Sequence, residues 1–166
     1  MAIGLNWELQ NEILIIGAGG YGRLVQEIAE AIGYKVDFLD DNSSLAVGKL
    51  DELERIEEQY DSSIVAIGNP KIKEKIFRRL KKPVTIIHPT ACVSASTVIG
   101  IGCVIEANAV VNSEAVVKDG SFICAGAIVN HNATVNEFCQ IDCNAVVSMG
   151  AEVPRNIKVQ SCTVFK

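Results

Sequence analysis

The chain has 166 residues, of which 49% are hydrophobic and 21% are charged, so it carries enough apolar material for one ordinary domain or two small ones. Its net charge of −5 and the absence of a basic stripe argue against nucleic acid or an anionic membrane as partner. No apolar segment approaches the length of a transmembrane helix.

Residues 1–11 show little pattern, and the first apolar run, Ile13–Ile16, follows the polar residues Asn6, Glu8 and Gln10. This run is too short for the apolar core of a signal peptide. We therefore expect no signal peptide and a soluble cytoplasmic protein.

The first half begins with a dinucleotide-type pattern. A strand at Glu12–Ile16 leads into the GxGxxG turn Gly17–Gly22, then into a helix that ends at Gly33 and a strand at Lys35–Leu39. The acidic pair Asp40-Asp41 follows about 20 residues after the glycines. Glycines let backbone N–H groups approach a phosphate at a helix N-terminus. This context predicts nucleotide binding without identifying the nucleotide.

The remainder of the first half completes a Rossmann-like α/β unit. We expect a short helix within Gly48–Glu58, a buried strand at Ser63–Ile67 and an amphipathic helix at Lys71–Leu80. The helix should place its apolar residues on one face: Ile72, Ile76, Phe77 and Leu80. The predicted domains are residues 1–82 and 83–166. The first is too short for a complete six-stranded dinucleotide domain and the second offers no hydride-transfer site, which disfavours an NAD oxidoreductase.

The second half repeats every six residues. The aliphatic positions are Ile87, Val93, Ile99, Ile105, Val111, Val117, Ile123, Val129, Val135, Ile141, Val147, Val153 and Val159. This period fits neither a helix nor an ordinary strand, but it is the signature of hexapeptide β-helix repeats. Four residues after each aliphatic residue from Ile87 to Val147 the side chain is small. Gly or Asn, which tolerate positive φ, often precede that small residue.

These three positions predict a triangular solenoid in which each hexad forms one short strand and one corner. The aliphatic side chain points inward and Gly or Asn turns the corner. Three hexads close one coil, so about 18 residues return the chain to the same face.

The cysteines do not indicate a zinc site or a catalytic thiol. All six lie in the second half, none are spaced as CxxC, and the chain has two histidines. Cys103 and Cys139 occupy the small-residue position and are interpreted as buried structural thiols. We expect no metal.

His131 is the candidate catalytic residue, because an outward imidazole in an apolar repeat has no core role to explain it. His88, which precedes Pro89 at the first corner, is interpreted as a residue of the domain junction.

The motifs GAGGYG, FLDD, AIGNPKIKEKI and VNHNATVNEF, taken together, resemble the sugar O/N-acetyltransferases of the sialic-acid O-acetyltransferase family. The resemblance extends over most of the chain from Ile13. It is strongest to bacterial N-acetyltransferases of UDP-4-amino-sugars.

The resemblance implies a left-handed parallel β-helix that assembles as a homotrimer, with active sites between subunits. It places the nucleotide-sugar on the first half, with Gly19, Gly20 and Tyr21 near the phosphates and Asp40, Asp41, Gly68 and Asn69 near the base and ribose. Acetyl-CoA is expected along the solenoid beside Gln140 and Gly150. His131 corresponds to the general base, which takes a proton from the sugar amine or hydroxyl as that group attacks the thioester.

The chain departs from the family pattern at several positions. Asn132 stands where a carboxylate usually follows the catalytic histidine, and we expect Glu137 or Asp142 to act as a substitute carboxylate. On that account, Asn132→Asp or Asn132→Glu would raise activity near neutral pH. Gln140 replaces a histidine, Tyr21 stands where relatives often have histidine, and we expect one to two coils fewer after Val159 than in relatives.

Two functions remain open at this point. One is an acetyl-CoA-dependent sugar acetyltransferase, with neither the acceptor sugar nor N- versus O-transfer fixed by the sequence. The other is a trimeric nucleotide-sugar-binding homologue that has lost transferase activity.

Overall fold

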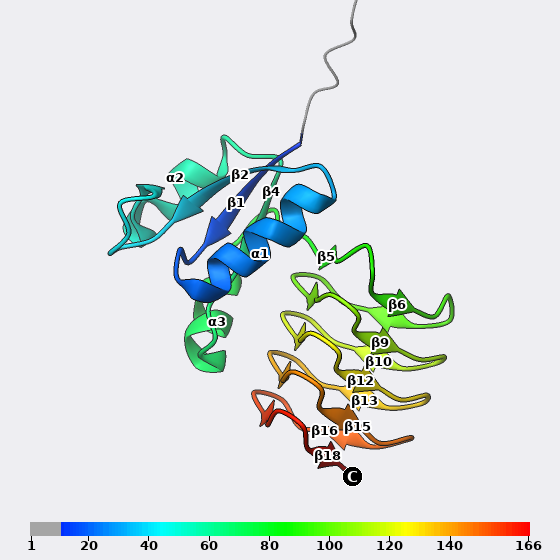
Figure 1. The fold of residues 1–166 in the computed structure, drawn as a ribbon. Helices are drawn as coiled ribbons and strands as arrows, with labels where there is room; N and C mark the ends of the chain where they lie inside the picture. Colours follow the sequence, from blue (N-terminus) through cyan, green and yellow to red (C-terminus); the bar gives the residue numbers. More distant parts are fainter. Residues whose placement is uncertain (1–10) are drawn as a thin grey trace, which may run out of the picture.

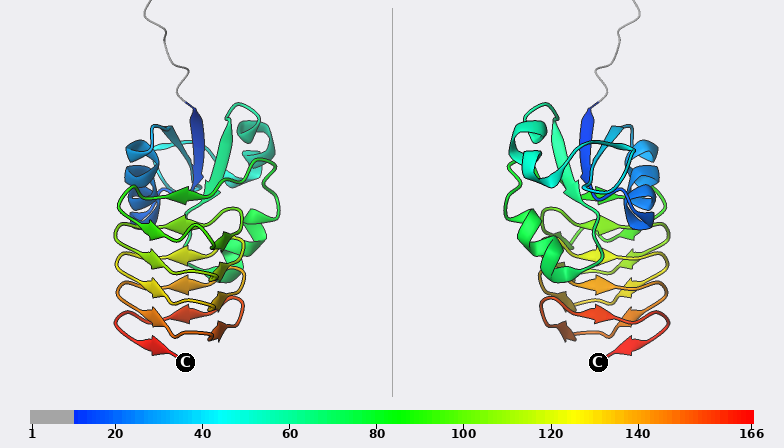
Figure 2. Two further views of the ribbon diagram at one scale, coloured as in Figure 1. Left: turned by 90° about the vertical axis from the view of Figure 1, so that its right-hand side faces the viewer. Right: turned by 90° about the vertical axis from the view of Figure 1, so that its left-hand side faces the viewer.

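The computed structural model describes residues 11–166, in which an α/β half sits on one end and one side of a three-sided solenoid (Figures 1 and 2). Residues 1–10, which make up most of the N-terminal stretch with little pattern, lie outside the described residues.

The α/β half is built on a four-stranded parallel sheet in the order β3-β2-β1-β4. Its elements are β1 (Glu12–Ile16), α1 (Gly20–Ala31), β2 (Lys35–Leu39), β3 (Ala46–Gly48), a 3₁₀ turn (Leu50–Glu52), α2 (Leu53–Glu57), β4 (Ser62–Val65) and α3 (Pro70–Phe77). The strand–turn–helix–strand unit at the start of the chain is therefore confirmed.

The central strand β1 is buried on both sides of the sheet, because alternate side chains point to opposite faces. Ile13 and Ile15 pack with α1 and with the solenoid. Leu14 and Ile16 pack on the other face with residues of α2 and α3.

Three details of this half differ from the sequence-based expectation. Ala46–Gly48, placed at the edge of a predicted loop and helix, forms the edge strand β3. Ile72 is 49% exposed, although its spacing predicted the packed face of α3. Lys73 is buried in its place, because α3 is covered on two sides, by the sheet against Ile76 and by the solenoid against Lys73.

The predicted solenoid is confirmed in detail, and its strands stack into three parallel sheets (Figure 2). The strands are β5 (Ile86–Ile87), β6 (Cys92–Val93), β7 (Val98–Ile99), β8 (Val104–Ile105), β9 (Val110–Val111), β10 (Val116–Val117), β11 (Phe122–Ile123), β12 (Ile128–Val129), β13 (Thr134–Val135), β14 (Gln140–Ile141), β15 (Val146–Val147), β16 (Glu152–Val153), β17 (Lys158–Val159) and β18 (Val164–Phe165).

The register of these sheets fixes the coil length. Ile123 pairs with Ile105 on one side and with Ile141 on the other, a separation of 18 residues in both directions. The aliphatic ladder from Ile105 to Val159 is buried inside the prism, and the first three members, Ile87, Val93 and Ile99, pack against it while partly exposed.

The corners turn through left-handed backbone conformations. Gly102, Gly120, Gly126 and Gly150 adopt positive φ there, and so do the asparagines Asn108, Asn132, Asn144 and Asn156. Glu114, Phe138 and Cys162 adopt the same conformation although they are neither glycine nor asparagine. The corner geometry is thus imposed by the repeat and not only by the residue at the corner.

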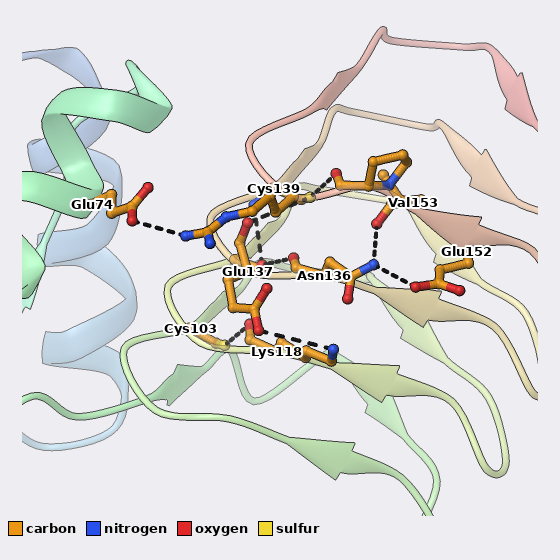
Figure 3. Close-up of polar contacts among 11 residues, drawn as sticks. Glu74, Cys103, Lys118, Asn136, Glu137, Cys139, Glu152 and Val153 are labelled. Carbon is orange, nitrogen blue, oxygen red and sulfur yellow. Dashed lines mark hydrogen bonds and ion pairs between the residues drawn. The ribbon is translucent and has the colours of Figure 1, made fainter.

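One sheet of the solenoid is covered by the α/β half. The outward side chains of Ile86, Val104 and Phe122 are fully buried and share a core with Ile13 and α1. An ion pair extends this contact toward the C-terminal end of the solenoid, since the Glu74 carboxylate of α3 accepts a hydrogen bond from the Arg155 guanidinium at 2.8 Å (Figure 3).

The proposed domain boundary lies within this junction. Pro83 forms a bridge with Ser63 of β4, and the Val84 N–H donates to the Ser63 carbonyl. The division after residue 82 stays a prediction.

Candidate active site

His131 lies at the solenoid corner between β12 and β13. Val129 and Ala133 on either side of it are fully buried and anchor the corner from inside. Asn132 turns the chain with φ of 60°. The imidazole is therefore held on the outer surface, where it is partly exposed, and the inward position of Val129 agrees with the predicted ladder.

The imidazole is held by a chain of two hydrogen bonds. His131 Nδ1 lies 2.8 Å from Asn132 Oδ1, and Asn132 Nδ2 donates to Glu114 Oε2 at 2.8 Å. Because a carboxylate only accepts, the amide NH₂ must face Glu114 and the amide oxygen must face the ring. The ring therefore carries its hydrogen on Nδ1, and Nε2 has the free lone pair needed to take a proton.

Neither of the predicted substitute carboxylates contacts His131. Glu137 lies 3.9 Å from the Lys118 ammonium (Figure 3), and Asp142 lies 3.0 Å from the Lys158 ammonium. The expectation was wrong for both residues, because each belongs to a different corner of the prism. Glu114, which the sequence reasoning missed, is the carboxylate that reaches Asn132. Glu114 precedes Asn132 by 18 residues, which is one coil, so the coil period alone predicts that these two residues lie side by side.

The glycine turn joins β1 to α1. Gly17 has φ of 108°, and a Cβ on Gly22 would lie 2.0 Å from the Gly17 carbonyl oxygen, so these two glycines allow the close packing of turn and helix. Gly19 and Gly20 are exposed, and a Cβ on either would meet nothing within 4 Å. The space beside them is open at the N-terminus of α1, where a phosphate is favoured.

The two aspartates after β2 organise the loops at this edge of the sheet. Asp40 Oδ2 accepts from the Ala18 N–H at 2.8 Å, and its Oδ1 accepts from the Asn42 N–H at 2.8 Å. The Ala18 bond, followed by the Asn42 bond, lowers the pKa of Asp40. Asp41 Oδ1 accepts from the Leu50 N–H at 2.9 Å. Both residues thus lie near the glycine turn, and both carboxylates already accept hydrogen bonds from backbone N–H groups.

Gly68 and Asn69 lie at the carboxyl end of β4, the strand next to β1, and both are exposed. Asn69 caps α3, since its Oδ1 accepts from the N–H groups of Lys71 and Ile72 at 3.1 Å. The structure therefore brings Gly19, Gly20, Asp40, Asp41, Gly68 and Asn69 to one edge of the sheet.

The side chain of Tyr21 points away from the phosphate position expected for it. Its ring stacks on Phe122 with centroids 4.8 Å apart, and its hydroxyl donates to Glu106 Oε1 at 2.9 Å. Burial, together with the neighbouring Cys124 and Glu106, raises the pKa of Tyr21. Glu106 is buried and also accepts from the Ala125 N–H at 2.9 Å. Tyr21 therefore fixes α1 to the solenoid.

The two residues predicted beside acetyl-CoA are separated. The Gly150 N–H donates to the His131 carbonyl oxygen at 3.2 Å, so Gly150 lies at the same corner as His131, one coil further along. Gln140 is buried on the sheet that the α/β half covers, with its Nε2 3.8 Å from Cys124 Sγ. Gln140 is therefore only 8% exposed, and its contact with acetyl-CoA stays a prediction.

A cavity lies between the two halves, and another lies on the solenoid alone. The first, of about 160 Å³, lies between α1 and the solenoid and is lined by residues including His88 and Glu106, which agrees with the interpretation of His88 as a junction residue. The other, of about 490 Å³, is lined by Asn136, Glu137, Glu152, Pro154 and Arg155 (Figure 3). His131 lines neither of these cavities.

The buried cysteines are structural thiols, and the described residues offer no metal site. Cys103 and Cys139 are fully buried in the small-residue position, and burial raises the pKa of Cys103 to about 11, which suits a structural thiol. Within residues 11–166, no three His, Cys, Asp or Glu side chains are grouped so that they could hold a metal ion. No helix in that range is long and apolar enough to cross a membrane.

Comparison with known proteins gives consistent matches for both halves. The PglD N-terminal domain model matches residues 12–80. The UDP-N-acetylbacillosamine N-acetyltransferase of Bacillus subtilis (strain 168) is 31% identical over an alignment of 111 residues, and the alignment covers 57% of this chain. The matched region spans about half, 51%, of the length of that curated enzyme.

Solved structures match almost the whole chain. The acetyltransferase domain of PglB from Neisseria gonorrhoeae FA1090 is 32% identical with a TM-score of 0.79, over 93% of this chain and 87% of that chain. The same domain in complex with acetyl coenzyme A is matched with a TM-score of 0.79 at 28% identity, over 93% of both chains. PerB from Caulobacter crescentus, in complex with CoA and GDP-perosamine, is 25% identical with a TM-score of 0.69, over 90% of this chain and 91% of that one.

Proposed function

The chain belongs to the acetyltransferase family that carries the PglD N-terminal domain, and from this premise we propose that it transfers the acetyl group of acetyl-CoA to the amine of a nucleotide-linked sugar. The observation that carries the proposal is an outward imidazole at a solenoid corner, with Nδ1 engaged by Asn132 and Nε2 free. Two similar structures support the choice of donor and acceptor, since one is in complex with acetyl coenzyme A and the other with CoA and GDP-perosamine.

In the proposed reaction, His131 acts as general base. Its Nε2 takes a proton from the sugar amine while the nitrogen attacks the thioester carbonyl. The tetrahedral intermediate then collapses, the C–S bond breaks, and the imidazolium returns a proton to the CoA thiolate. The products are an N-acetyl sugar and free CoA, and no covalent enzyme intermediate is needed. Holding both substrates against one imidazole supplies much of the rate acceleration.

We assign the nucleotide to the carboxyl edge of the α/β sheet, where ligands of such sheets usually bind. Exposed Gly19 and Gly20 would present backbone N–H groups to the diphosphate. Asp40, Asp41 and Asn69 would lie beside the nucleoside through the groups that the loop hydrogen bonds leave free. Tyr21 is left out of this site, because its ring stacks on Phe122 and its hydroxyl donates to Glu106.

We assign acetyl-CoA to the outer surface of the solenoid near the corner of His131 and Gly150. The relative that contains acetyl coenzyme A is matched over 93% of its chain, which supports a shared platform for the cofactor. No metal takes part in the proposed reaction.

We further propose a homotrimer in which a neighbouring solenoid completes the site. The sheet next to His131 has an apolar outer row, made up of Cys92, Val110, Ile128, Val146 and Val164. Val164 is 56% exposed, and Val98 on the adjacent sheet is 61% exposed. A second copy over these residues would remove apolar area from water and enclose the imidazole.

Because both co-substrates are cytoplasmic metabolites, we place the protein in the cytoplasm.

The test of the activity is acetylation by the purified chain of a panel of UDP- and GDP-linked amino sugars, followed by release of the CoA thiol and by mass spectrometry of the sugar. We expect transfer to amino sugars and none to the matching hydroxyl sugars. Transfer to the hydroxyl sugars would change the assignment to O-acetylation. Binding of a nucleotide-sugar by calorimetry without turnover would favour the alternative, a binding homologue without transferase activity. Sedimentation of the same sample tests the trimer.

A further inference from the structure

Glu114 and His131 are brought together by the stacking of coils. The corner between β12 and β13 repeats the corner between β9 and β10, so the side chains of residues 113 and 114 lie directly next to those of residues 131 and 132. The Asn132 N–H donates to the Ser113 carbonyl oxygen at 3.1 Å, which fixes this alignment in the backbone.

The position of Glu114 is itself held from the coil before it. The Glu114 N–H donates to Ser96 Oγ at 3.1 Å, and Glu114 adopts φ of 57°, a conformation that is costly for a residue with a side chain. Its carboxylate is thereby aimed along the stack at the amide of Asn132.

We propose that Glu114 is a positioning residue for His131 that acts through Asn132. The carboxylate orients the Asn132 amide, and the amide oxygen in turn holds the hydrogen of the ring on Nδ1. Nε2 is left as the base. When Nε2 takes a proton, the negative charge of Glu114 favours the imidazolium through the polarised amide. Glu114 and Asn132 together therefore orient the ring and favour its protonated form, as a carboxylate directly beside the histidine would do. This inference rests on the proposed function for its catalytic meaning.

No other titratable side chain of the adjacent corners competes for this role. The coil before contributes Asn112, Ser113 and Glu114 to the corner, and the coil after contributes Ser148, Met149 and Gly150. Within these two sets, Glu114 is the residue that carries a charge. The Asn130 side chain accepts a hydrogen bond from the His131 backbone N–H at 2.8 Å and makes none to the ring, so it positions the main chain.

The contact also changes the expectation for Asn132→Asp. A carboxylate at position 132 would face the carboxylate of Glu114 across the present 2.8 Å contact, and the two would repel each other. The single substitution therefore does not place a well-held charge beside the ring. In the pair Asn132→Asp with Glu114→Gln, the glutamine NH₂ donates to the new aspartate, and the charge moves next to the imidazole.

The first experiment needs no substrate. The chain has two histidines, so ¹⁵N spectra of the rings, assigned with His131→Ala, report the tautomer of His131 and the pH at which it titrates. We expect the Nδ1–H tautomer in the neutral ring. Glu114→Gln keeps an acceptor for Asn132 but removes the charge, and should make the ring accept its second proton at lower pH than in the unmodified protein.

Two further variants separate orientation from charge. Glu114→Gly removes the side chain without backbone strain, since glycine accepts positive φ, and should release the Asn132 amide so that the Nε2–H tautomer appears. Glu152→Gln is the matched control: Glu152 accepts from Asn136 Nδ2 at 2.9 Å, the same Asn-to-Glu contact, with no imidazole attached (Figure 3). It should leave both readings unchanged. An Nε2–H tautomer in the unmodified protein, or equal titrations in Glu114→Gln and Glu152→Gln, overturns the inference.

The kinetic experiment connects the relay to catalysis. In Glu114→Gln, the acid limb of the kcat profile should move to lower pH in step with the ring titration, with KM for the nucleotide-sugar unchanged. The double variant Asn132→Asp, Glu114→Gln should move the limb back up. If the unmodified protein acetylates no nucleotide-sugar, the proposed function fails while the spectroscopic result stands. If it is active and the limb does not move, the inference fails alone.

Discussion

The Lys73 ammonium group lies 3.5 Å from the centroid of the Phe122 ring, in the contact between α3 and the solenoid. The Lys73 side chain is only 1% exposed. Burial lowers the pKa of Lys73 from 10.5 to about 8. A charged amine in this position is stabilised by the ring but loses most of its hydration.

We predict that Lys73→Met stabilises the fold at pH 7. Below about pH 8 the lysine is protonated in both states and its full burial cost is present. Between about 8 and 10.5 the unfolded chain binds the extra proton, so rising pH favours the folded lysine protein. The variant should gain about 1–3 kcal/mol at pH 7, after allowance for the lost ring contact, and the gain should shrink across that pH range. Urea unfolding at several pH values measures it.

Lys71→Met, an exposed position on the same helix, is the control for this measurement. It should change the free energy of unfolding by less than about 0.5 kcal/mol. A difference between the Lys73 variant and the unmodified protein that does not vary with pH would contradict a buried amine with a lowered pKa.

We predict that His131→Ala lowers kcat by at least ~100-fold, the scale of general-base catalysis, while the melting temperature stays close to that of the unmodified protein. The reason is that the ring lies outside the prism, so its removal leaves the buried ladder intact. His88→Ala, which removes the other histidine, should retain turnover. Equal rates for His131→Ala and the unmodified protein would remove the imidazole from the mechanism.

We predict different effects for two glycines of the same turn, one on the stability of the protein and the other on KM for the nucleotide-sugar. Gly22→Ala should destabilise the protein by about 2 kcal/mol or more, because the new Cβ would meet the Gly17 carbonyl oxygen at 2.0 Å. Gly20→Ala meets nothing within 4 Å, so it should fold normally and raise KM for the nucleotide-sugar by crowding the diphosphate. Thermal unfolding and steady-state kinetics separate the two effects. Normal KM in Gly20→Ala would argue against a phosphate at this turn.

We predict that Tyr21→Phe destabilises the contact between the halves by about 1–3 kcal/mol, because Glu106 would lose a donor while buried. The Phe122 stacking remains in this variant, so the loss reports the hydroxyl alone. Glu106→Gln retains partners for both contacts and should cost less. A double-mutant cycle gives the coupling energy of the pair, and additive effects would contradict a direct hydrogen bond.

The solenoid could be predicted from the sequence because its period, its inward residues and its corner residues all repeat. Each hexad repeats the same local signal, so even an irregular corner such as Phe138 does not shift the register. The strand–turn–helix–strand unit of the α/β half was found for a similar reason, since the glycine spacing is tied to close packing of turn and helix.

The partners of individual side chains were harder to predict. Glu137 and Asp142 were chosen because they are near His131 in the chain, whereas contact in a solenoid follows the coil period and selects Glu114. The contacts that Tyr21 makes with Glu106 and Gln140 makes with Cys124 were not predicted, for a related reason. A sequence pattern shows that a residue faces outward from its own element, but it does not show which outward face the other half covers.

Glu106 and His131 sit on consecutive coils, the first tied to the α/β half through Tyr21 and the second carrying the free imidazole nitrogen. Every complete coil adds one strand spacing of about 4.8 Å to the stack. Inserting or deleting 18 residues between the two would move the imidazole along the axis by that step while preserving the direction it faces. The distance along the solenoid axis between the reactive nitrogen and the α/β half can thus change only in steps of one coil. Protein engineers could use such steps to match longer or shorter acceptors.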